Sequence, residues 1–152
     1  MREWSGGFTE KYLYSRGKGK KRYDAVFKEL ARKNGLTQNE VDVILFLANN
    51  PSFDTARDIV EYRSMSKSHV CKSVESLSQK GLLSGRQDEE DRRVTHLLLS
   101  PCAHELTVNL KEAQKQFFAG LLAGVTPEEM ELFGTILDKI IHNIEGDMDY
   151  DC

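Results

Sequence analysis

Hydrophobic residues recur every three or four positions in six segments of the chain, which is the spacing of an α-helix with one face against a core. These segments begin near residues 21, 38, 56, 66, 101 and 127. The first ends at Gly35 and has a kinked or frayed extension back towards Phe8, because Gly17 and Gly19 weaken a helix there. The second is apolar on both sides, which predicts a buried central helix.

Capping signals mark several helix starts. A Ser or Thr followed three residues later by an acid satisfies exposed backbone N–H groups at the start of a helix. The chain has such pairs at three starts: Thr37 with Glu40, Thr55 with Asp58, and Thr126 with Glu129. Pro101 lies at the first position of the fifth helix, where proline is favoured. No internal repeat or low-complexity linker separates the segments.

The helix over 66–80 has an apolar inner stripe and a polar outer face. Val70, Val74 and Leu77 form the stripe. The opposite side carries Ser68, Lys72, Glu75 and Gln79, flanked by His69 and Ser76. Two short strands follow at 82–86 and 93–99. A charged turn separates them, so they predict an antiparallel hairpin.

Two short helices around a tight turn, followed by a hairpin, predict a winged helix-turn-helix. In this fold the first residues of the second helix reach base edges in the major groove. The candidates there are small or cationic side chains: Ser66, Lys67, Ser68, His69, Lys72 and Ser73. At the hairpin tip, Arg92 and Arg93 are candidates for the minor groove, and Asp91 can hold a guanidinium in place. Weaker candidates, for phosphate contacts, are Arg57, Arg63 and Arg86.

The charge of the chain is divided by segment. The formal net charge of -3 alone argues against nucleic acid, but residues 1–35 carry +6 and residues 63–86 carry +4. Residues 126–152 carry -7. Salt screens charges beyond about 8–10 Å, so a partner meets the local patch rather than the total. The predicted DNA-reading segment is therefore basic despite the acidic total.

Several functional classes are excluded on composition. No apolar run reaches the roughly 18 residues that a membrane span needs, and the charged start does not resemble a secretory signal. Cys71, Cys102 and Cys152 are too few and too scattered for a disulfide framework, which favours the cytoplasm. Cys71 is predicted to fill the core beside Val70. No catalytic constellation, cofactor-binding motif or recognisable metal set occurs, so we expect neither an enzyme nor a cofactor.

Residues 36–100 resemble the DNA-binding core of the MarR (multiple antibiotic resistance regulator) family of bacterial transcription factors. The resemblance is carried by Leu36-Thr37, Ser66-Lys-Ser-His-Val-Cys-Lys-Ser-Val74, Leu77-Ser-Gln-Lys-Gly-Leu82, the Asp-x-Arg pattern at Asp91-Arg92-Arg93, and Leu99-Ser100. It implies a mainly α fold with a small β-hairpin, built as one domain over 1–152. Residues 8–34 and 101–145 would be dimerisation helices, and 146–152 an acidic tail.

The resemblance further implies a homodimeric repressor that binds an inverted repeat in double-stranded DNA and is released by a small aromatic or phenolic effector. The wide apolar stripes of the last two helices independently favour a dimer. Thiol-switch members carry their sensing cysteine in the first helix, and this chain has no cysteine before Cys71, so that mechanism is not supported.

Three alternatives stay open at this point. Lys67, His69 and Lys72 can simply form a solvated helix face, and Arg93 can serve only a salt bridge within the hairpin. The same fold can act as an architectural or protein-interaction module without ligand control. A ligand-binding or enzymatic protein would need polar groups converging in an apolar pocket, which a sequence does not display.

Overall fold

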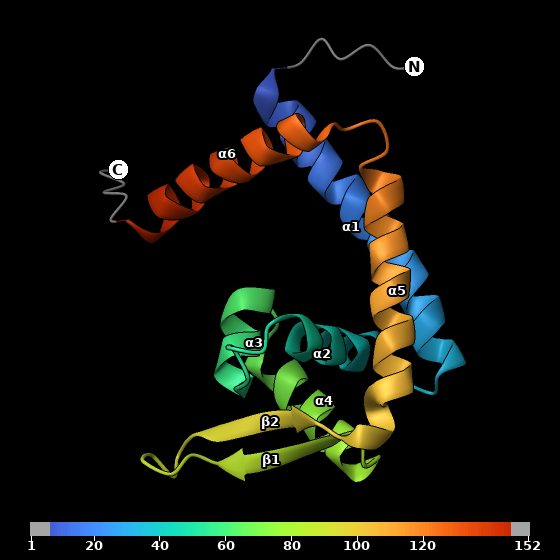
Figure 1. Cartoon of the computed structure of the whole chain (residues 1–152), viewed down its shortest axis with the longest axis vertical. Coiled ribbons are helices and arrows are strands. Elements are labelled where there is room, and N and C mark those ends of the chain that lie inside the picture. The colour runs from blue at the N-terminus through green and yellow to red at the C-terminus, as the bar shows by residue number, and fades with distance from the viewer. Residues whose placement is uncertain (1–6, 147–152) are drawn as a thin grey trace. The chain divides into compact units, whose positions relative to one another are not determined.

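The computed structural model describes residues 7–146, which form two compact units that meet within a helix at Lys115 and Gln116. The first unit contains α1 (Phe8–Lys33), α2 (Gln38–Asn49), α3 (Ala56–Arg63), α4 (Lys67–Gln79), β1 (Leu83–Gln87) and β2 (Thr95–Leu99) (Figure 1). A 3-10 turn over Pro101–Ala103 leads into α5 (His104–Leu121), and α6 (Pro127–Glu145) belongs to the second unit. The predicted order of six helices and one hairpin is confirmed over the described residues.

Helix α1 differs from the expectation of a kinked or frayed start. It runs without interruption from Phe8 and includes Gly17 and Gly19. Each glycine costs a helix about 0.5–1 kcal/mol relative to alanine, which the length of the flanking helix offsets. A Lys20–Asp24 ion pair of 2.7 Å, one turn apart, adds local support.

The core of the first unit is centred on α2. Every residue from Glu40 to Leu47 is buried, which confirms the prediction of a central helix covered on both sides. Side chains from the surrounding elements complete the core: Phe27, Ile59, Val70, Leu77, Leu83, Leu97 and Leu110. The winged-helix elements are thus positioned by packing against one helix.

Two buried acids of α2 are paired with cations from other helices. Glu40 completes the capping box with Thr37 and also accepts from Lys80 Nζ at 2.9 Å. Burial alone would raise the pKa of Glu40, but hydrogen bonds from Ser76, Lys80 and the Thr37 backbone hold it below its usual value. Asp42 accepts from Arg63 at 2.6 Å. The start of α2 is therefore tied to the end of α4, and its middle to the end of α3.

The three predicted capping boxes are all present. At α2, α3 and α6 the threonine side chain accepts from the backbone N–H three residues on, and the acid at that position accepts from the threonine backbone N–H. These local contacts set the starts of three helices without help from distant residues.

The hairpin is antiparallel, with Leu83 opposite Leu99 and Gln87 opposite Thr95. Its inner residues Leu83 and Leu97 are buried. Strand β2 is also tied to the loop before α3, where the Leu97 N–H donates to the Asp54 carbonyl at 2.7 Å and Thr55 bridges to His96. The wing is thereby attached to the helix-turn-helix through its base.

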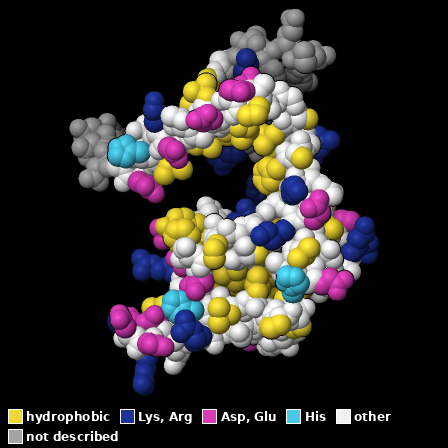
Figure 2. Space-filling view, viewed as in Figure 1, with side chains coloured by type: hydrophobic (Ala, Val, Ile, Leu, Met, Phe, Trp, Pro, Cys, Tyr) yellow, Lys and Arg dark blue, Asp and Glu magenta, His cyan; other side chains and the backbone are white. Residues whose placement is uncertain are grey.

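The second unit exposes its hydrophobic side chains. No residue of α6, over Pro127–Glu145, is buried. The exposed apolar residues of this helix are Met130, Leu132, Phe133, Ile136, Leu137, Ile140, Ile141 and Ile144. Figure 2 shows hydrophobic side chains along α6. Over residues 7–146, none of the helices is long and apolar enough to cross a membrane.

Candidate nucleic-acid interface

A tight turn joins α3 to α4 and sets the start of the second helix. Ser64 takes a left-handed conformation, with φ of 55°, directly after α3. Ser66 then caps α4, because its side chain accepts from the His69 N–H at 3.3 Å. The Oγ atoms of Ser66 and Ser68 lie 3.3 Å apart. The first turn of α4 therefore presents a defined set of polar groups.

The outer face of α4 carries most of the predicted DNA-contacting side chains. Ser66, Lys67, Ser68, His69 and Lys72 are exposed. Val70 and Leu77 are fully buried on the opposite side, as predicted, and Val74 is partly buried. The helix thus presents small and cationic groups outwards, with no large apolar side chain among them.

Ser73 and Cys71 differ from their predictions. Ser73 is only 5% exposed, which does not fit a contact with a base, and Cys71 is exposed rather than a core filler. At 100° per residue, Ser73 lies about 60° from Val70 and Cys71 about 100° from it on the other side. The buried stripe extends towards Leu77, so it covers Ser73 and leaves Cys71 at the edge. There Cys71 lines a cavity of about 310 Å³ with Arg57 and Lys67.

At the hairpin tip, Asp91 holds Arg93. The Asp91 carboxylate accepts from the Arg93 backbone N–H at 3.0 Å, from Nε at 3.1 Å and from Nη2 at 3.2 Å. These hydrogen bonds hold the pKa of Asp91 below its usual value, and the bond from the guanidinium has the largest effect. The Arg93 side chain remains 91% exposed. The predicted support role of Asp91 is formed in the structure, and Arg93 projects into solvent.

Beneath the tip, His96 bridges two carboxylates. Its Nδ1 lies 2.7 Å from Asp54 Oδ1 and its Nε2 lies 3.0 Å from Asp88 Oδ2. Hydrogen bonds to the two carboxylates raise the pKa of His96, and the bond to Asp54 has the larger effect. The bond from His96, together with the Asp91 and Glu90 N–H groups, lowers the pKa of Asp88 to about 2. Figure 2 shows charged side chains gathered around the hairpin.

Sequence reasoning missed this bridge. Asp54 and His96 are 42 positions apart, and no local spacing connects them. Asp88 carried a weak signal, since an Asp at the start of a turn often accepts from backbone N–H groups further on. The carboxylate of Asp88 does so, from Glu90 and Asp91 at 2.9 and 2.8 Å.

Of the weaker candidates for phosphate contacts, Arg63 is paired with side chains of the first unit. It pairs with buried Asp42, lies over the Tyr23 ring at 5.5 Å and donates to Tyr23 Oη at 3.4 Å. Burial raises the pKa of Asp42 despite the guanidinium. Arg57 and Arg86 are exposed, with Arg86 4.0 Å from Glu89. Within residues 7–146, no group of three or more His, Cys, Asp and Glu side chains is arranged to hold a metal ion.

A polar helix after a tight turn, packed on a buried helix and followed by an arginine-tipped hairpin, defines a winged helix-turn-helix protein. Residues 34–94 match the sequence model of the MarR family. Over these residues the chain is similar to MarR-family transcriptional regulators.

A relative of known sequence and several solved structures are similar to a larger share of the chain. The chain is 24% identical over 112 residues to YdgJ of Bacillus subtilis, described as an uncharacterised HTH-type transcriptional regulator; the match covers 74% of this chain and 68% of the relative. A MarR-family regulator from Silicibacter pomeroyi matches with a TM-score of 0.78 and 21% identity over 97% of this chain and 99% of its own. Another from Listeria monocytogenes, solved with a 26mer DNA, matches with a TM-score of 0.74 and 15% identity, over 95% and 90% of the two chains.

Proposed function

We propose that the protein is a homodimeric repressor that reads an inverted-repeat operator and is released by a small-molecule effector. The observation that carries this proposal is the outward polar face of α4 beside an exposed wing arginine. Helix α4 has 13 residues, about 20 Å of helix, and the major groove is about 12 Å wide. Its first two turns would enter the groove, with Arg93 in the adjacent minor groove.

The proposed contacts fall into two kinds. Ser66, Ser68 and His69 offer short donors and acceptors to base edges, while Lys67 and Lys72 reach bases or phosphates. Arg93, and with it Arg92, would meet the enhanced negative potential of the minor groove. Ser73 is left out of this set because it is buried.

The exposed face of α6 supports a dimer. Eight apolar side chains of one helix stand more than a third exposed, and an apolar surface of this kind on a chain of 152 residues is typical of an interface. A second copy is the occupant we propose, because α1 is basic where α6 is acidic and two copies can place opposite charges together. A dimer presents two α4 helices, which explains an inverted repeat.

A cavity at the end of α3 is the proposed effector site. It measures about 230 Å³ and is lined by residues that include Asn49, Tyr62, Arg63 and Gln114. That volume suits a single aromatic ring rather than a larger ligand. The DNA binding of one structural relative, BpsR of Bordetella bronchiseptica, is regulated by 6-hydroxynicotinic acid. An acid of this kind would compete with Asp42 for Arg63, which ends α3 just before the turn into α4.

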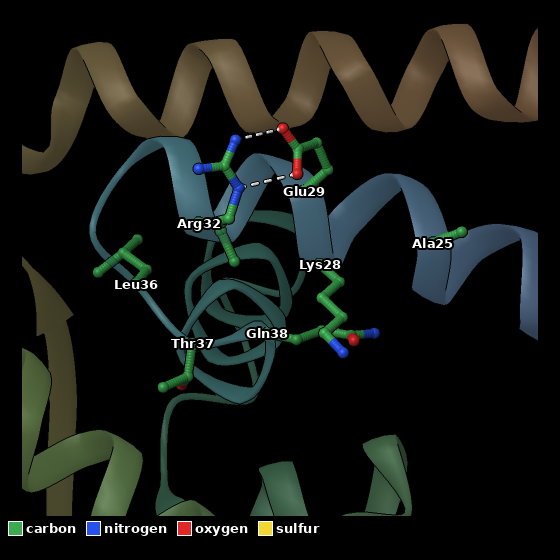
Figure 3. A pocket seen from close by; sticks show the side chains of 8 residues that line it. Ala25, Lys28, Glu29, Arg32, Leu36, Thr37 and Gln38 are labelled. Carbon is green, nitrogen blue, oxygen red and sulfur yellow. Dashed lines mark hydrogen bonds and ion pairs between the residues drawn. The ribbon is translucent and has the colours of Figure 1, made fainter.

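A second cavity, of about 550 Å³, is less suited to an anionic effector. It lies between the end of α1 and the start of α2, and Figure 3 shows Arg32 and Glu29 facing each other beside it. Their two hydrogen bonds, of 3.0 and 2.8 Å, neutralise the guanidinium. The cavity borders the link between the start of α2 and the far end of α4, so a ligand here would act away from the first turns of α4.

Selection of random duplexes with the purified protein at near-physiological salt tests the proposal. We expect an inverted repeat with half-sites about one helical turn apart. Affinity should fall steeply with salt concentration. A plot of log K against log salt should have a slope of roughly -0.9 for each phosphate that the protein neutralises. Recovery of no common sequence, with a flat salt dependence, would favour a protein-interaction module instead.

A further inference from the structure

The two ring contacts of His96, in the wing, together require one particular protonation state. A neutral imidazole has one N–H donor and one acceptor nitrogen. Both ring nitrogens of His96 lie within hydrogen-bonding distance of carboxylate oxygens, at 2.7 and 3.0 Å. An ionised carboxylate only accepts, so both bonds form together only when the ring carries two protons.

The bridge continues from His96 to the wing arginine. Asp88 uses one oxygen, Oδ2, for His96 and the other, Oδ1, for the Glu90 and Asp91 N–H groups. Asp91, placed by that turn, then holds Arg93 through three hydrogen bonds. At the other end, Asp54 precedes Thr55, the cap of α3. A continuous chain of contacts therefore joins the start of the helix-turn-helix to the wing tip.

We propose that doubly protonated His96 is a positioning residue for Arg93, and that loss of its second proton releases the wing and weakens DNA binding. The inference rests on the proposed DNA-binding function. Above the titration of His96, the neutral ring keeps one carboxylate and faces the other with a lone pair. The wing then loses either the His96–Asp54 contact or the His96–Asp88 contact, while the backbone bond from Leu97 to Asp54 stays.

Other charged groups near β2 do not replace this role. Arg86 lies opposite His96 on β1, and Glu89 is 4.0 Å from it, so this cation is partly offset. On α3, Asp58 is committed to the Thr55 cap, and Arg57 is exposed. On α2, Glu40 and Asp42 are paired with Lys80 and Arg63. Asp54 and Asp88 are thus the carboxylates that respond to the charge of His96.

The test has two parts, the first of which needs no DNA. Nuclear magnetic resonance titration of the full chain should give His96 a pKa above the ordinary 6.5, and Asp54→Asn or Asp88→Asn should lower it. The second part measures affinity for a selected duplex from pH 5.5 to 8.5 at constant ionic strength. Wild type should bind about five- to tenfold more weakly at the upper end.

Two variants and one control separate positioning from a general structural effect. His96→Gln should lose the His96 part of the pH dependence. Asp88→Asn keeps Oδ1 for the backbone N–H groups and replaces Oδ2 with an NH₂ group, which donates to a neutral imidazole. In this variant the bridge from Asp54 through His96 to residue 88 therefore forms at high pH. The fall of DNA affinity with rising pH should flatten or reverse. His104→Gln, an exposed histidine at the start of α5, should keep the wild-type profile.

Two results would overturn the inference. One is a His96 pKa at or below 6.5, which would mean that the ring is not held as an imidazolium. The other is a pH profile of His96→Gln parallel to that of wild type while both bind DNA. Absence of DNA binding at every pH would instead overturn the proposed function and the DNA part of this inference, while the titration still decides the bridge.

Discussion

Asp91 binds both the backbone N–H and the guanidinium of Arg93, and it leaves that side chain 91% exposed. The acid therefore does not cover the arginine. It limits the directions that a long, flexible side chain can take, which reduces the entropy lost when the arginine enters a groove. This geometry accounts for acids at a wing tip, which by charge alone would repel DNA.

Asp91→Asn separates geometry from charge. By charge alone, removal of a negative group next to DNA should tighten binding. Because the asparagine holds Arg93 less firmly, we expect DNA binding roughly two- to twelvefold weaker. Fluorescence anisotropy with a selected duplex measures it, and Glu89→Gln, which removes the same charge from a nearby exposed position, is the control. Equal tightening by both variants would show that Asp91 acts only as a charge.

Arg93→Ala should weaken binding to the operator by about 1–3 kcal/mol and leave the oligomeric state unchanged. If Arg93 neutralises a phosphate, the slope of log K against log salt should also fall by about 1. Arg22→Ala, on exposed α1, serves as the matched loss of an arginine. Should both variants bind as wild type does, the wing is not part of the interface.

Ile140→Asp places a charge in the apolar face of α6. Because this face is exposed in one copy, the variant should fold but remain monomeric at micromolar concentration, as measured by sedimentation velocity. Lys139→Glu, at the neighbouring position, changes charge outside the apolar face and should keep the dimer. A dimeric Ile140→Asp would place the interface elsewhere.

Asp42→Asn should lower the free energy of unfolding by about 1–3 kcal/mol, because it weakens the charged bond to Arg63 and leaves a half-buried guanidinium less well paired. Urea denaturation at fixed protein concentration measures the change. The comparison is Glu29→Gln, which breaks an exposed ion pair with Arg32 and should cost clearly less, because solvent screens that pair. Similar losses in the two variants would contradict a special role for the Asp42 pair.

The wing bridge should also give stability a defined pH window. The pKa of His96 is raised from 6.5, so its contribution is complete below pH 6.5 and is lost as pH rises through the higher folded value. The pKa of Asp88 is lowered from 3.8 to about 2, so its contribution is present above pH 3.8 and is lost as pH falls towards 2. Both act together between about pH 4 and 6.5. Urea unfolding across pH 3–9 should show His96→Gln losing the decline on the alkaline side that wild type shows.

The parts of the fold that depend on local sequence were predicted correctly. Capping boxes at Thr37, Thr55 and Thr126 each depend on residues three positions apart, and the buried stripe of α4 follows from helical geometry. The continuous course of α1 through Gly17 and Gly19 was not predicted, because helix propensity is a small term that neighbouring turns offset.

Predictions of single side chains failed where the outcome depended on distant partners. The pairing of Arg63 with Asp42 was not predicted, because only the fold brings the two residues together. Cys71 and Ser73 lie on opposite edges of the same stripe, and the direction from which neighbouring helices pack decides which of them is covered. The His96 bridge joins three segments, so no pattern along one segment could show it.

The contact between Lys80 and buried Glu40 has a consequence for how binding preferences change over evolution. It fixes the far end of α4 to the start of the central helix, while Ser66 and the turn at Ser64 fix its near end. Helix α4 is therefore held at both ends. Under the proposed function, exchange of exposed Lys67, His69 and Lys72 would change the DNA sequence that is bound without altering the scaffold, whereas Ser68 also contacts the capping hydroxyl of Ser66.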